Sequence, residues 1–157
     1  MNRPHRMGAP LMVSLFTGGL VFFWLFGFPV MAFERFVNNH NGTITDNQTG
    51  LMWAAQDNGS PINWMDAQSY CNAYRVGGHA DWRMPTLDEL AGLYEPQEKN
   101  RRGYHLSKEI ETTAASCWAR ETDGDRAARF NFTYGTAYWL RQPYSGPTRV
   151  LPVRTPQ

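Results

Sequence analysis

The polar stretch over residues 99–108 gathers the side chains of this 157-residue chain that are best suited to bind an anion. Arginine recognises carboxylate and sulfate groups through paired hydrogen bonds, and neighbouring aromatic rings add apolar contact area. We therefore treat the stretch as a candidate binding loop, whose residues are Lys99, Arg101, Arg102, Tyr104, His105 and Lys108. A solvated loop with balanced charge is the competing interpretation, because four glutamates flank it: Glu95, Glu98, Glu109 and Glu111.

Residues that could catalyse a reaction or hold a metal are scattered rather than grouped. Cys117 with His79 or His105 would form a cysteine–histidine pair, but nothing in the sequence brings them together. The histidine and aspartate spacing matches no zinc or calcium pattern, and a β-turn explains Asp123-Gly124-Asp125. The sequence therefore predicts a non-enzymatic protein that has no cofactor and no metal.

Charge and composition exclude several classes of protein. The chain has 15 lysines and arginines against 14 acidic residues, and a balance this close to neutral excludes nucleic-acid binding by bulk charge. Charged residues make up only 18 % of the chain and aromatic residues 14 %, which argues against disorder and coiled coil. A single folded domain rich in aromatic residues is the expectation.

Residues 1–32 have the composition of an export signal. Basic residues precede an apolar run over residues 11–28, and Val30-Met31-Ala32 supplies small residues at a cleavage site. We expect cleavage after Ala32, which would leave residues 33–157 in the periplasm or outside the cell. The run is nearly as long as the roughly 20 residues that span a membrane. A retained hydrophobic helix, with membrane contact only through residues 7–33, is therefore the alternative.

The first half of the domain predicts a hairpin and a helix. Two β-prone segments, residues 43–45 and 51–53, flank a turn that ends at Gly50. Asn63 is the expected N-cap of a helix over residues 64–74, with Asp66 in the first turn. Helical spacing places four residues on one inward face: Ala67, Tyr70, Cys71 and Tyr74.

A short extended segment and a second helix follow. Trp82 and Met84 alternate with Asp81 and Arg83, so we expect the first pair to pack and the second pair to bind polar neighbours. Pro85 keeps the preceding residue extended. Thr86 and Glu89 have the spacing of a capping box, which predicts a helix that runs to about residue 95. Its expected inward residues are Leu87, Leu90, Ala91 and Tyr94.

The second half is expected to be rich in strands. Residues 97–114 predict a long polar loop, and four β-like segments follow it at residues 116–120, 126–132, 137–140 and 149–154. A hairpin, two helices and then a run of strands indicate an α+β domain with an antiparallel sheet.

Three stretches of the sequence resemble a bacterial family, the Lcl C-terminal domain family, a domain formerly of unknown function. The stretches are residues 35–53, 64–71 and 78–90. The motif residues that carry the resemblance are Trp53, Trp64, Asp66, Tyr70, Trp82, Arg83, Pro85, Thr86 and Glu89. The resemblance implies a C-type-lectin-like fold, which is also similar to that of formylglycine-generating enzymes. We expect these residues to hold the fold rather than to catalyse.

The resemblance also implies what the domain does. The namesake domain binds sulfated polysaccharide, so we expect an exported binding or adhesion module of the bacterial envelope that recognises a glycan or a protein. The alternative is an anchored accessory subunit of a membrane complex with its domain outside the cytoplasm. A formylglycine-generating activity needs two reactive cysteines in the C-terminal part, where this chain has only Cys117. In an oxidising compartment, we expect a disulfide between Cys71 and Cys117.

Overall fold

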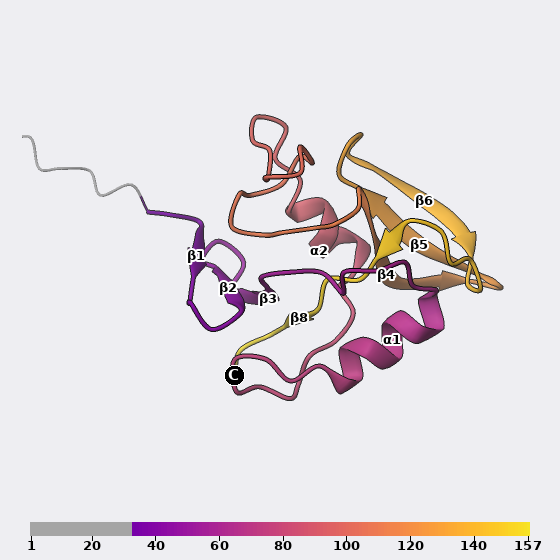
Figure 1. The fold of residues 1–157 in the computed structure, drawn as a ribbon, viewed down its shortest axis with the longest axis horizontal. Coiled ribbons are helices and arrows are strands. Elements are labelled where there is room, and N and C mark those ends of the chain that lie inside the picture. The colour runs from indigo at the N-terminus through magenta and orange to yellow at the C-terminus, as the bar shows by residue number, and fades with distance from the viewer. Residues whose placement is uncertain (1–32) are drawn as a thin grey trace, which may run out of the picture. The chain divides into compact units, whose positions relative to one another are not determined.

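Two four-stranded sheets and two helices form the part of the chain that the structure, a computed structural model, describes: residues 33–157 (Figure 1). The first sheet contains, in spatial order, β1 (Phe36–Asn38), β2 (Thr43–Asp46), β3 (Leu51–Ala54) and β8 (Val153–Arg154). The second contains β6 (Thr136–Arg141), β5 (Arg126–Asn131), β4 (Ser116–Asp123) and β7 (Thr148–Arg149). The domain is therefore α+β, as predicted. The predicted signal or anchor over residues 1–32 lies outside the described residues.

Both sheets are antiparallel except for one strand pair, in which β7 runs parallel to β4. The predicted hairpin is present as β2 and β3, and Gly50 has the positive φ that ends its turn. The C-terminal strand β8 pairs with β3, which places the end of the chain beside the N-terminal hairpin. This pairing joins segments about a hundred residues apart in the sequence, so it connects the C-terminal end of the domain to its N-terminal hairpin through main-chain hydrogen bonds.

Helix α1 spans Trp64–Ala73, and its ends are those that the sequence predicts to within one residue. The Asn63 side chain caps its first turn by accepting the backbone N–H of Asp66 at 2.9 Å. Ala67 and Cys71 are buried on the inward face. The expected helix is therefore confirmed, with Ala67 and Cys71 of its predicted inward face buried and Tyr70 and Tyr74 half-buried.

Helix α2 spans Leu87–Gly92 and is shorter than predicted, because Tyr94 leaves the helix to form a β-bridge with Leu106. Both halves of the predicted capping box are present at its start. Ala91, expected to face inward, is exposed, whereas Leu93 at the C-cap is buried. The early end of the helix therefore changes which residues reach the core.

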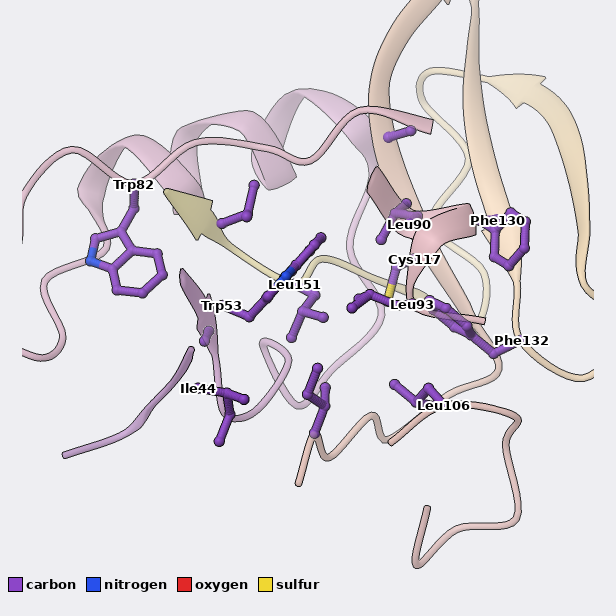
Figure 2. Packing of buried hydrophobic residues seen from close by; sticks show 14 of the residues in the cluster. Ile44, Trp53, Trp82, Leu90, Leu93, Leu106, Cys117, Phe130, Phe132 and Leu151 are labelled. Atoms are coloured by element: carbon purple, nitrogen blue, oxygen red, sulfur yellow. The ribbon is translucent and has the colours of Figure 1, made fainter. Parts of the chain in front are cut away.

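The two helices pack on opposite faces of the second sheet (Figure 1). Trp118 and Ala127 share a buried cluster with α1, while Phe130 belongs to the cluster that contains α2. Figure 2 shows the latter cluster, which contains Trp53 of the hairpin strand β3, Leu90 of α2 and Leu93 at the C-cap of that helix. Aromatic side chains supply much of the buried apolar area, as the composition indicates.

Among residues 33–157, neither helix is long and apolar enough to cross a membrane.

Candidate ligand-binding surface

The motif residues around α2 form a connected set of hydrogen bonds. The Arg83 guanidinium donates to both carboxylate oxygens of Glu89 at 2.8 and 2.7 Å, and Glu89 also accepts the Thr86 backbone N–H at 2.8 Å. Burial alone would raise the pKa of Glu89, but these hydrogen bonds outweigh it and lower that pKa. Trp82 and Met84, between the charged residues, are buried. The predicted alternation is thus present, and these side chains position α2.

The other motif residues also make contacts within the fold. The indole N–H of Trp64 donates to the Ala119 carbonyl at 2.8 Å, which ties the start of α1 to β4. Trp82 packs edge-on against Tyr74, which in turn lies 5.5 Å, centroid to centroid, from Tyr70. The Trp64 and Trp82 contacts tie α1 to β4 and to the extended segment before α2, the Tyr70–Tyr74 contact lies within α1 and its C-cap, and none points to a reacting group.

The expected disulfide is absent from the structure, in which Cys71 and Cys117 are both free and buried. The physical reason is strand alternation in β4. Trp118 faces the α1 side, where Cys71 lies, so its neighbour Cys117 faces the α2 side beside Leu90 and Leu93 (Figure 2). Burial raises the pKa of Cys71 to about 12 and that of Cys117 well above its ordinary value.

The candidate loop over residues 99–108 contains no helix or strand, and the structure divides its residues between two roles. Tyr104 packs against the core, and the ring of His105 lies 5.7 Å from that of Tyr94. Arg101 forms an ion pair with Glu111 at 3.1 Å. The side chain of Asn100 is buried beneath the loop and stabilises it by donating a hydrogen bond to the Ile110 carbonyl.

The remaining basic residues of the loop are exposed: Lys99, Arg102 and Lys108. Lys108 lines a shallow depression together with Glu98 and Glu109. Three of the four flanking glutamates, Glu98, Glu109 and Glu111, therefore lie beside basic groups of the loop, whereas Glu95 is bound by Arg35. The structure does not bring the six predicted binding residues together into one patch.

A different surface combines exposed aromatic rings with a guanidinium group. The Arg129 guanidinium lies 5.7 Å from the centre of the Tyr138 ring and 5.8 Å from that of Tyr144. The two rings are 41 and 38 % exposed. Tyr138 lies opposite Arg129 in the β5–β6 pair, and Tyr144 comes from the connection after β6. We name Arg129, Tyr138, Leu140 and Tyr144 the aromatic–arginine face.

Arg129 has no carboxylate partner within ion-pair distance among residues 33–157. One Nη atom donates to the Thr148 hydroxyl at 2.9 Å, while the buried Nε has no hydrogen-bond acceptor in the described part of the chain. A guanidinium without a counter-charge between two exposed rings can receive an anionic group of a ligand. Leu140 and Tyr144 also line a depression beside this face, together with Arg141 and Pro143.

Sequence reasoning missed this face because β6 gives an ambiguous signal. Its run Ala137-Tyr138-Trp139-Leu140 is apolar on both sides, which is typical of a strand buried between two layers. In the structure β6 is an edge strand, and the whole run is exposed or only half-buried. The signal in the sequence that could have indicated an exposed aromatic surface is a group of four aromatic residues near a turn whose spacing does not alternate with polar residues: Tyr134, Tyr138, Trp139 and Tyr144.

The comparisons with known proteins agree with the resemblance of the motifs. The sequence model of the family described as the Lcl C-terminal domain matches residues 42–154 of this chain. The match covers most of the chain and all of the motif residues, so the chain belongs to the Lcl C-terminal domain family. No curated protein matches it.

Proposed function

We propose that this member of the Lcl C-terminal domain family is an exported, non-enzymatic binding module of the bacterial envelope that recognises an anionic glycan. The observation that carries the proposal is the Arg129 guanidinium, which lies by the exposed rings of Tyr138 and Tyr144 and has no carboxylate partner among residues 33–157. Family membership supports the choice of ligand, because the resemblance implies that the namesake domain binds sulfated polysaccharide.

The chemistry of the aromatic–arginine face suits such a ligand. The faces of aromatic rings pack against the C–H groups of a sugar ring, and the tyrosine hydroxyls remain available for hydrogen bonds. Guanidinium groups donate paired hydrogen bonds to sulfate or carboxylate oxygens. A single charge at the centre of the face gives modest affinity, so adhesion would depend on several domains that bind the same polymer.

The loop over residues 99–108 is a second candidate surface for the same function. Lys99, Arg102 and Lys108 are exposed there and have no ion pair in residues 33–157. We rank it below the aromatic–arginine face, because Arg101 is paired with Glu111 and because the loop's two rings are used for packing.

Retention of the purified protein on an immobilised sulfated glycan, compared with the same glycan without sulfate, tests the proposal. We expect retention on the sulfated column and earlier elution of Arg129→Ala and of Tyr138→Ala/Tyr144→Ala. Arg75→Ala is the matched control, since it removes an exposed arginine whose hydrogen bonds are only to local carbonyls. If the wild type passes both columns unretained, the function is wrong. If only Arg101→Ala/Arg102→Ala elutes early, the loop is the site.

Two further parts of the proposal concern export and fold. We propose cleavage after Ala32, and sequencing the N-terminus of protein from the bacterium distinguishes this from a retained anchor and accessory-subunit role. A chain that starts at Phe33 supports export, whereas an intact Met1 supports the anchor.

We also propose that the fold is C-type-lectin-like, given the family and the order of hairpin, two helices and antiparallel sheet. Superposing an experimental structure on C-type lectins tests this.

A further inference from the structure

The outer edge of β6 is a strand edge that no segment covers in the described part of the chain. Of the two edges of its sheet, β7 is two residues long, whereas β6 has six residues, five of them exposed. Proteins usually protect such an edge with proline, a bulge or several charges, because its unpaired N–H and C=O groups bind other strands. β6 has no proline and no glycine, and its single charged residue is Arg141 at the end.

We infer that β6 pairs antiparallel with the same strand of a second copy, which joins two four-stranded sheets into one of eight strands. The inference does not depend on the glycan proposal, since it concerns the edge of the strand rather than its face. Among possible partners, an extended strand is the one whose main-chain donors and acceptors match this row in register, whereas a sugar cannot do so.

The sequence of β6 fits its own copy. In a symmetric pair centred on Trp139, that residue lies opposite Trp139 of the partner subunit, and Tyr138 lies opposite the partner subunit's Leu140. Aromatic and large apolar residues directly opposite each other stabilise antiparallel pairs. The alternation that pairing with β5 imposes is kept, because Tyr138 and Leu140 share one face and Ala137, Trp139 and Arg141 share the other.

Charge also favours a second copy. In the same register Arg141 lies opposite the partner subunit's Ala137, so no like charges meet across the pair. Within its own chain Arg141 forms an ion pair with Asp125 at 3.1 Å, whose partners are both exposed, so the guanidinium can still interact with a charge on the second copy. Residues 33–157 carry thirteen basic and fourteen acidic side chains, so two copies do not repel each other through net charge.

The symmetry of this pairing has a structural consequence. A two-fold axis perpendicular to the joined sheet places both aromatic–arginine faces on the same side. The dimer would present two such faces side by side along one sheet.

Substitution at Ala137 tests the register by charge. Ala137→Lys places a lysine opposite Arg141 of the partner subunit twice in the dimer, while Ala137→Glu places a carboxylate there. We expect analytical ultracentrifugation of the purified protein to show a concentration-dependent dimer. The dissociation constant should rise about tenfold for the lysine variant and fall by a similar factor for the glutamate variant. Met65→Lys, at an exposed apolar residue of α1, should change nothing.

Three outcomes would overturn the inference. The first is a protein that stays monomeric up to millimolar concentration, which would leave the edge for a strand of another protein. The second is a dimer whose stability does not depend on the residue at position 137. The third is a dimer that responds equally to Ala137→Lys and Met65→Lys. Association through residues 1–32 would give the second outcome, and circular dichroism melting of each variant identifies any that fails to fold.

Discussion

Arg35 and Asp46 form a bidentate ion pair, in which the guanidinium Nε and Nη2 atoms each donate to a different carboxylate oxygen at 3.1 Å. Asp46 is 1 % exposed, and Arg35 also donates to Glu95 and to the Gly92 carbonyl, both at 2.7 Å. Burial by itself would raise the pKa of Asp46, yet the hydrogen bonds, chiefly from Arg35, lower it. One side chain thus joins the N-terminal hairpin to the end of α2.

Arg35→Ala should lower the free energy of unfolding by about 3–5 kcal/mol, because it leaves a buried carboxylate without its counter-charge. Arg141→Ala is the matched control, since it breaks an ion pair whose partners are 78 and 65 % exposed. That change should cost at most about 1 kcal/mol. Urea unfolding of both variants measures the difference. Equal losses would show that the hairpin does not depend on Arg35.

Glu89→Gln should destabilise the domain by about 1–2 kcal/mol near neutral pH, because it removes the charge that Arg83 binds. The folded pKa of Glu89 lies below its ordinary value of 4.5. The ionised pair therefore stabilises the fold above that pH, and the contribution is lost as the pH falls through the folded pKa. The difference in stability between wild type and variant should shrink in acid. A difference that is constant from neutral pH to acid would contradict the assignment.

Native Cys71 and Cys117 should resist alkylation at pH 8, because both are fully buried and their pKa values are raised. After unfolding without reductant, both should react, which mass spectrometry would detect as two added groups. A chain that gains none would contain the disulfide that the structure lacks.

Trp118→Phe should destabilise the domain by roughly 1–3 kcal/mol. Its indole N–H donates to the Ile62 carbonyl at 2.8 Å, and phenylalanine would leave that carbonyl without a partner. Tyr134→Phe removes a hydroxyl from an exposed ring and serves as the control. Thermal melting of the two variants compares them, and an unchanged melting temperature for Trp118→Phe would count against the role of this bond.

Local patterns in the sequence predict local structure well in this domain. The capping box of Thr86 and Glu89 depends only on residues three apart, and both of its hydrogen bonds are present. Trp82 and Met84 pack while Arg83 pairs with Glu89, as strand alternation predicts. These features need no knowledge of the rest of the chain.

Features that depend on distant segments were not predictable in the same way. Which face of β4 the first helix covers is a tertiary property, and it decides that Cys117 faces away from Cys71. The edge position of β6 is another, because its apolar run also suits a buried strand. The pairing of Arg35 with Asp46 depends on how the chain enters β1, which no motif of the sequence specifies.

Hydrogen exchange of the purified protein, with and without a saturating sulfated oligosaccharide, tests whether the aromatic–arginine face binds the glycan. It should be measured at low protein concentration, so that pairing of β6 between copies does not contribute. We expect slower exchange in Thr136–Arg141 and in residues 142–147, around Tyr138 and Tyr144. Slower exchange confined to residues 97–110, or no change anywhere, would contradict the claim that the aromatic–arginine face binds the ligand.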